Sequence, residues 1–331
     1  MLQDTHITLA HGNGGRYMRE LITELFAHYL PTSDTHNDAA ILPWNSSEIV
    51  ITTDGFTVQP LEFPGGNIGS LAIHGTTNDL AVMGAIPHYL TLNTFIEEGF
   101  ETKRLECIVQ SLASTADDIG VKIVAGDTKV VRRGEGGGLY LATTGVGVRQ
   151  QTLQLGLEHI QPGDAVLVSG PVGDHGIAVM LAREQFGLRG DLQSDAASVL
   201  PLTQALLNLP GLRFMRDPTR GGLATVAHEI AQFTGHNVRL IQTAIPIRDP
   251  VQSVCDMLGF DPLYLACEGR VVAVIEASQA EIALQRWQSQ GHKAAIIGHI
   301  EIGKARVILQ TELGGERLLD ELEDDPLPRI C

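Results

Sequence analysis

Apolar and polar positions along the first half of the chain predict strands and helices in alternation. Residues 16–30, RYMRELITELFAHYL, repeat apolar positions at helical spacing. Further helices are predicted at 67–85 and 102–120, the latter closed by Gly120. The apolar runs at 48–56, 88–96, 121–129 and 138–148 predict strands, with Asp54 and Asp127 in acidic turns at the ends of two of them. The pattern indicates an α/β domain over residues 1–150.

A second α/β unit is predicted over residues 151–315. Strands are expected at 164–170, 269–278 and 294–300. Helices are expected near 176–186 and 198–208, with another opened by the turn RDPTRGG. The remaining segment, 316–331, is acidic and then proline-stiffened, and ends at Cys331. It is predicted to be a mobile arm instead of a packed helix.

Composition narrows the class of protein. A chain of 331 residues suits two domains, and 44% hydrophobic content with 36 glycines suits a globular α/β protein. The formal net charge of −16 argues against nucleic acid or an anionic membrane as a partner. No apolar run reaches membrane length, and the first residues lack a signal-peptide pattern. The four scattered cysteines favour reduced thiols in the cytoplasm, and Cys107, Cys255 and Cys267 are expected to be buried.

Common catalytic signatures are missing from the sequence. There is no G-x-x-x-x-G-K-[ST] loop, no G-x-S-x-G elbow and no dinucleotide fingerprint. The segment HEIAQ has glutamine where a zinc protease needs its second histidine. Any nucleotide site must therefore be built in a less common way.

Acidic and glycine-rich turns are the chemical features that remain. Asp54, Asp79 and Asp127 are candidate Mg²⁺ ligands, because Mg²⁺ prefers carboxylate oxygens together with phosphates. Asp164, Asp174 and Asp217 lie in similar turns and stay open as alternatives. Lys129 is a candidate phosphate contact or base. The candidate ATP and phosphate contacts are Gly12, Gly14, Gly15, Gly66, Asn67 and Asp127. Each turn taken singly also has an ordinary structural explanation.

Together these motifs resemble a known family. The segments FPGGNIGSLAIHGTTNDLAVMGAIPHYL, VAGDTKVV, VSGPVGDHG and RDPTRGGL are similar to the superfamily of aminoimidazole ribonucleotide synthetase and selenophosphate synthetase. The closing PRIC narrows the resemblance to HypE, the carbamoyl dehydratases of hydrogenase maturation. The similarity runs from AHGNGG to the last residue. It implies a two-domain aminoimidazole-ribonucleotide-synthetase-like α/β (α+β) fold whose first domain dimerises through its sheet, with ATP and Mg²⁺ bound.

The resemblance also implies a reaction and partners. The carbamoyltransferase HypF would load a carbamoyl group onto Cys331, and ATP-dependent dehydration would convert it to a thiocyanate, giving ADP and phosphate. The cyano group would pass to iron in a HypC–HypD complex for the [NiFe]-hydrogenase cofactor. Cys331 would then be a carrier on an eight-residue arm that reaches about 26–29 Å when extended.

A base must take protons from the amide nitrogen during this dehydration. Glu268, in LACEGRVV, is the first candidate for this catalytic role and Lys129 the second. Two alternatives remain. One is an ATP-dependent kinase or synthetase of the same superfamily acting on a free small substrate. The other is a non-catalytic adaptor that uses its tail only to bind other maturation proteins.

Overall fold

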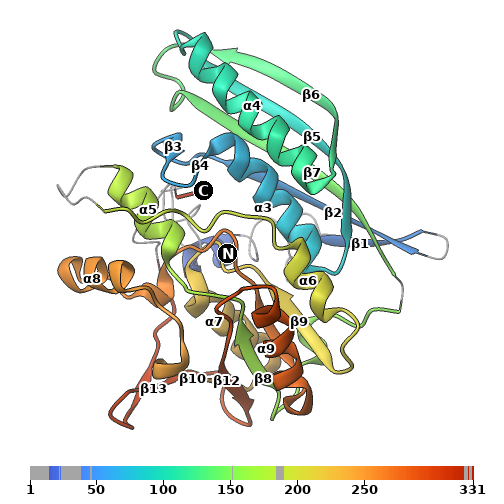
Figure 1. The fold of residues 1–331 in the computed structure, drawn as a ribbon, viewed down its shortest axis with the longest axis vertical. Helices are drawn as coiled ribbons and strands as arrows, with labels where there is room; N and C mark the ends of the chain where they lie inside the picture. The colour runs from blue at the N-terminus through green and yellow to red at the C-terminus, as the bar shows by residue number, and fades with distance from the viewer. Residues whose placement is uncertain are drawn as a thin grey trace.

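Two β-sheets of different connectivity organise the chain (Figure 1). The computed structural model describes residues 15–21, 23, 39–44, 47–150, 152–183, 190–323, 327 and 330–331. The predicted helix at 16–30 is described only in its first part, as α1 (Gly15–Leu21). Gly12 and Gly14, two of the candidate phosphate contacts, lie outside the described residues.

The first sheet has five strands and is covered by helices on one face. Its order is β1 (Ala40–Trp44), β2 (Ser47–Phe56), β7 (Leu139–Gln150), β5 (Ile86–Glu97) and β6 (Lys122–Val131). β5 and β6 are parallel and the other pairs are antiparallel. Helices α3 (Ile68–Val82) and α4 (Thr102–Ile119) lie on the same face (Figure 1). A small hairpin, β3 (Glu62–Phe63) and β4 (Gly66–Asn67), leads into α3.

Local sequence explains the ends of these helices. Asn67 caps α3, because its side chain accepts hydrogen bonds from the backbone of Gly69 and Ser70, and the Ser70 hydroxyl completes a capping box. Gly69 also lets α4 approach, since a Cβ there would lie 2.4 Å from the carbonyl oxygen of Ile108. α4 ends at Gly120 with φ 81°, a left-handed conformation that favours glycine. Both helix predictions are confirmed.

The second sheet has seven strands in a mixed order. The order is β14 (Glu316–Leu318), β13 (Val307–Gln310), β10 (Asn237–Ile241), β12 (Ala295–Glu301), β8 (Ala165–Val168), β11 (Val272–Ile275) and β9 (Leu212–Arg216). The helices here are α5 (Asp174–Ala182), α6 (Leu200–Leu206), α7 (Gly222–Thr234), α8 (Asp249–Leu258) and α9 (Ala280–Ser289). Short 3₁₀ turns occur at Leu157–His159, Gln242–Ala244, Pro262–Tyr264 and Ala277–Gln279.

Some predicted boundaries change in the structure. Asp54 lies inside β2, and Asp127 lies inside β6, so neither is in a turn. The cause is strand pairing, because Asp54 is in register with Thr143 and Asp127 with Asn93. Residues 316–318, assigned from sequence to the arm, form β14. Cys255 and Cys267 are buried as expected. The same expectation is wrong for Cys107, which lies on the exposed side of α4.

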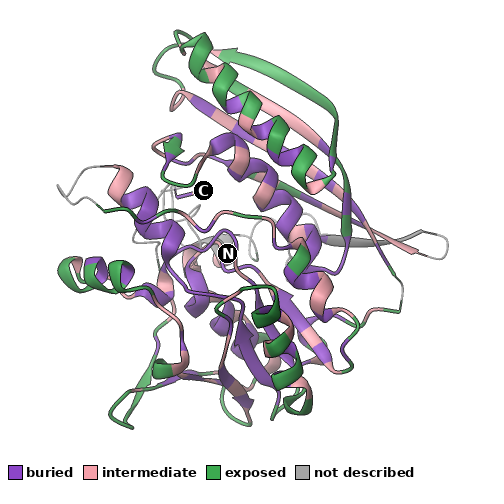
Figure 2. Cartoon of the chain, in the orientation of Figure 1, coloured by how far each residue is buried: buried purple, intermediate pink, exposed green. Residues whose placement is uncertain are grey.

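The two units share a hydrophobic core. One cluster combines Phe56 and Ile68 of the first unit with Ile177 of α5. Leu327 and Ile330, near the end of the chain, belong to the same cluster. Figure 2 shows α3 largely buried between the units, whereas β6 is exposed along its length. The end of the chain therefore packs where the two units meet.

Candidate functional site

The base of the C-terminal segment is fastened to the second unit and to α1. The backbone N–H of Leu319 donates to Val307 O at 3.0 Å. The backbone N–H of Arg16 donates to Leu322 O at 2.9 Å. The Arg16 guanidinium pairs with Glu323 at 2.9 Å. Gly15 permits this approach, because a Cβ there would lie 2.3 Å from Leu322 O.

The tip of the segment is seated between the two units, where the C label stands in Figure 1. Ile330 is 4% exposed. Thr57, directly after β2, donates its backbone N–H and its hydroxyl to the backbone oxygen of Cys331, at 3.0 and 3.2 Å. His175 of α5 contacts the carbonyl oxygen of Ile330 through Nε2 at 2.8 Å. Contacts from both units thus fix the backbone on either side of the thiol.

The Cys331 thiol faces one cation and two carboxyl groups. Arg220 hydrogen-bonds to the thiol and also pairs with Asp54 at 3.2 Å. Burial, together with Glu268 and Asp54, raises the pKa of the Cys331 thiol to about 12, against the opposing effect of Arg220. Burial would lower the pKa of Arg220, but Cys331 and Asp54 outweigh it and raise that pKa. The seated sulfur is therefore protonated at neutral pH and is a poor nucleophile.

Glu268 is buried, at 1% exposure, just before β11. Its backbone N–H donates to Asp195 Oδ1 (3.2 Å), and its carbonyl accepts from Asn78 Nδ2 of α3 (3.0 Å). Within the described residues its Oε1 has no hydrogen-bond partner. Burial, and then the nearby Asp217 and Asp195, raise its pKa well above the ordinary value. This environment therefore favours the protonated form of the carboxyl group.

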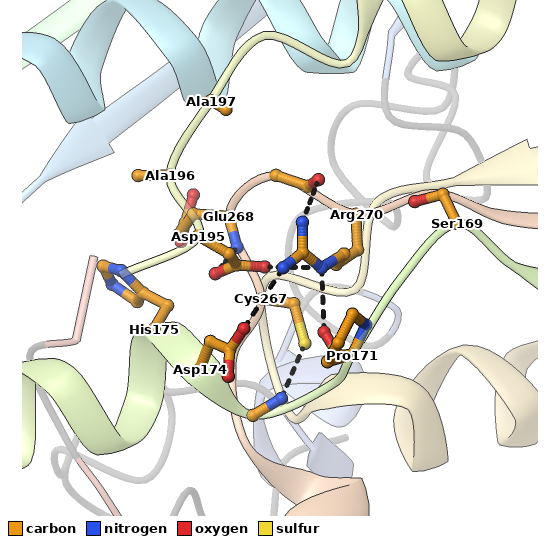
Figure 3. A network of polar contacts seen from close by, with 12 residues as sticks. Ser169, Pro171, Asp174, His175, Asp195, Ala196, Ala197, Cys267, Glu268 and Arg270 are labelled. Atoms are coloured by element: carbon orange, nitrogen blue, oxygen red, sulfur yellow. Dashed lines mark hydrogen bonds and ion pairs between the residues drawn. The ribbon is translucent and has the colours of Figure 1, made fainter. Parts of the chain in front are cut away.

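The partly buried Arg270 lies beside Glu268 and Asp195 (Figure 3). Arg270 donates to Pro171 O (2.8 Å) and Asp174 Oδ2 (3.1 Å), and lies 3.4 Å from Asp195 Oδ2. Burial and Asp195 raise the pKa of Asp174 to about 6, although Arg248 and Arg270 favour its charge. These contacts of Arg270 hold the backbone next to Glu268 in place.

Two of the three predicted metal ligands lie together. Asp54 and Asp79 both act on the charge of Arg220, and Asp79 accepts a hydrogen bond from Thr52 at 2.8 Å. Two carboxylates fit Mg²⁺, which is usually held by one or two carboxylates plus substrate phosphates. Among the described residues, no group of three histidine, cysteine or acidic side chains is placed to hold a metal ion.

Asp127 and Lys129 lie elsewhere. Asp54 of β2 and Gly126 of β6, the residue before Asp127, are in register across the sheet and are separated by three strand spacings. This corresponds to about 14 Å. Side chains alternate along a strand, so Asp127 points to the face without helices, opposite Asp54. It pairs there with Lys129 at 2.8 Å, and both side chains are more than half exposed. Within a single chain, Asp127 and Lys129 therefore do not lie beside Cys331.

The described glycine-loop residues have structural roles. Asn67 uses its side-chain oxygen to cap α3, and Gly66 packs against Phe63 and Ser70. Gly15 lies against the base of the C-terminal segment, away from the capped helix. The alternatives Asp174 and Asp164 are held by protein groups, the first by Arg270 and the second by the backbone N–H of Gln161 at 2.8 Å.

Sequence reasoning missed the residues that hold the C-terminal tip. Arg220 and His175 lie in the motifs RDPTRGGL and VSGPVGDHG, which were noticed for their glycines and acids. Asn78 bridges the two units by accepting from Val199 N (2.9 Å) in addition to its bond to Glu268 O. The available signal was a polar side chain inside a glycine-rich or apolar motif.

The fold and the site define a class, the AIR synthase related proteins. The model of their N-terminal domain matches residues 36–149, and that of their C-terminal domain matches residues 161–310. None of the described helices is long and apolar enough to cross a membrane.

Within that class the chain belongs to the HypE family of carbamoyl dehydratases. It is 44% identical to carbamoyl dehydratase HypE of Azotobacter vinelandii over 100% of this chain and 98% of that relative. The crystal structure of a HypE–HypF complex matches with a TM-score of 0.85 at 41% identity, covering 91% of this chain and 99% of that one. A crystal structure of HypE in complex with ATP matches with a TM-score of 0.81 at 39% identity, covering 98% and 100%.

Proposed function

We propose that this protein dehydrates an S-carbamoyl group on its own Cys331 to a thiocyanate, with conversion of ATP to ADP and phosphate, in [NiFe]-hydrogenase maturation. The observation that carries the proposal is the position of Cys331, seated between the two units beside Arg220, Asp54 and Glu268. The family membership and the relative solved with ATP support the same activity.

The residues around the thiol suit the chemistry. Removing oxygen from an amide requires a leaving group, and transfer of the γ-phosphoryl group of ATP to that oxygen provides one. Mg²⁺ held by Asp54 and Asp79 would neutralise charge on the phosphates. Arg220, which already contacts the sulfur, is placed to neutralise charge on the adjacent oxygen.

Glu268 is the proposed acceptor of the amide protons. Burial and neighbouring carboxylates raise the pKa of this carboxyl group and so favour its protonated form. A cation bound beside Asp54 would lower that pKa, since it would offset the negative charge facing Glu268. The base would then become competent only in the loaded site. Lys129 lies on the open face of the first sheet, away from Cys331. We propose it as a second catalytic residue that acts through the dimer described next.

We also propose a homodimer formed through the open face of the first sheet. That face carries Ile49, Ile51, Ile86, Tyr89, Phe95, Val146 and Val148. Two aromatic residues on the open face of β5 are exposed, Tyr89 at 49% and Phe95 at 39%, as expected of a surface that another chain covers. Asp127 and Lys129 share this face and would lie at the dimer interface, where a second chain could complete their surroundings. A Tyr89→Glu change should shift the sedimentation coefficient to that of a monomer.

The partners follow from the same reaction. HypF would supply the carbamoyl group, in line with the HypE–HypF complex of the relative. A HypC–HypD complex would receive the cyano group on iron. We place the reaction in the cytoplasm, because the carrier thiol must stay reduced.

Intact mass spectrometry tests the proposal. The protein is incubated with HypF and its substrates, and its mass is recorded before and after addition of Mg-ATP, with Cys331→Ala as control. We expect one carbamoyl adduct on the wild type only, followed by loss of one water. An adduct that persists in Mg-ATP, or one that also forms on the control, would favour the superfamily kinase acting on a free substrate. Absence of any ATP turnover would favour the adaptor.

A further inference from the structure

His175 holds the C-terminal segment through a single, well-defined hydrogen bond. The ring is fully buried, and its Nε2 lies 2.8 Å from the carbonyl oxygen of Ile330, the residue before the reactive cysteine. The carbonyl can only accept, so Nε2 must carry the proton. The edge of the ring also packs against Phe63, with centroids 5.3 Å apart.

The other ring nitrogen is fixed by Ser194. Ser194 Oγ lies 2.7 Å from His175 Nδ1 and accepts the backbone N–H of Ala196 at 3.0 Å. Because Nε2 carries the proton, Nδ1 of the neutral ring can only accept, so the serine hydroxyl donates to it and stabilises the Nε2–H tautomer. Burial lowers the pKa of His175, so the ring stays neutral and the tautomer is retained.

The loop that carries Ser194 also serves Glu268. Ser194 N donates to Pro64 O of the first unit at 2.8 Å. The next residue, Asp195, accepts the backbone N–H of Glu268 at 3.2 Å. Figure 3 shows Asp195 between His175 and the guanidinium group of Arg270. Neighbouring residues of one loop thus fix the position of the thiol-bearing segment and of the proposed base.

We propose that His175, oriented by Ser194, and Thr57 are positioning residues that clamp the backbone on either side of the Cys331 sulfur and bring it to the site. The inference rests on the proposed function, in which Cys331 carries the carbamoyl group. Holding the backbone oxygens of Ile330 and Cys331 leaves the sulfur between them little freedom, and alignment of reacting groups contributes strongly to rate. Arg16 of α1 pairs with Glu323, so the segment is also held on the side away from the clamp.

The variants that test the clamp are His175→Leu, His175→Gln and Thr57→Val in the complete protein. The amide N–H of glutamine replaces the Nε2–H, whereas leucine removes it. His74→Leu is the matched control, because His74 is a mostly buried histidine on α3 near Asp118 of α4.

Two readouts separate docking from chemistry. The first is the alkylation rate of Cys331 by iodoacetamide relative to the exposed Cys107, read by peptide mass spectrometry. The second is the single-turnover rate of water loss from the carbamoylated protein at saturating Mg-ATP. For His175→Leu we expect alkylation at least about tenfold faster and water loss at least about tenfold slower, with an unchanged KM for ATP. Thr57→Val should show a smaller change, and His175→Gln should recover most of the wild-type behaviour.

The outcomes distinguish this inference from the proposed function. Wild-type protection of Cys331 in His175→Leu, or an equal loss of protection in His74→Leu, would overturn the clamp. A carbamoylated wild type that never loses water would refute the proposed function, and the alkylation readout would still decide whether the clamp exists.

Discussion

Alkylation of Cys331 should continue to accelerate above the pH at which an ordinary thiol levels off. The perturbation is pH alone. In the seated state, burial and then Glu268 and Asp54 raise the thiol pKa from its ordinary 9.0 to about 12, with Arg220 opposing them. Only the protonated thiol is well accommodated, so ionisation favours release of the segment.

The magnitude follows from the two pKa values. Seating is at full strength below pH 9 and is lost as pH rises from 9 towards 12, a total of about 4 kcal/mol. At pH 10 the thiolate form of the released cysteine is about tenfold more populated than its neutral form, whereas the seated thiol is almost wholly neutral. Seating should therefore be about elevenfold weaker at pH 10 than at neutral pH.

The assay is the iodoacetamide rate at Cys331 between pH 7 and 10, compared with a synthetic peptide of residues 324–331. The peptide rate should be half-maximal near pH 9 and should level off towards pH 10, because alkylation requires the thiolate. In the protein the rate should be lower at pH 7 and should still be rising at pH 10. Equal rates and equal plateaus for protein and peptide would refute the reasoning.

Three further predictions concern catalysis and stability. Glu268→Gln should slow water loss at least about a hundredfold while Cys331 still becomes carbamoylated, as judged by intact mass; an unchanged rate would remove Glu268 as the base. Asn78→Ala should lower the free energy of unfolding by about 3–5 kcal/mol in urea titrations, because three buried hydrogen bonds between the units are lost, whereas Asn93→Ala on the open face should change it little. Burial lowers the pKa of His74 from 6.5 to about 4, so the free energy of unfolding should fall by up to about 3 kcal/mol as pH drops from 6.5 to 4. In His74→Gln the free energy of unfolding should depend less on pH over this range. The same pH dependence in the variant and the wild type would contradict this assignment.

Sequence alone determined the local elements and the family. Apolar periodicity and Gly120 placed two helices correctly, because capping and helical spacing depend on residues a few positions apart. The run of glycine-rich motifs with the closing PRIC gave the family and hence the expected activity. It also marked Glu268 and Cys331, which lie in short distinctive segments.

Tertiary structure decided which of the candidates meet. Asp54 and Asp127 look equivalent in the sequence, yet strand pairing places them three strands apart on opposite faces. His175 bonds Ile330, 155 positions further along the chain, and Arg220 reaches Cys331 across a similarly long stretch of sequence. Such contacts depend on sheet order and on the packing of one unit against the other. No local pattern of residues contains that information, because it exists only once distant segments are brought together.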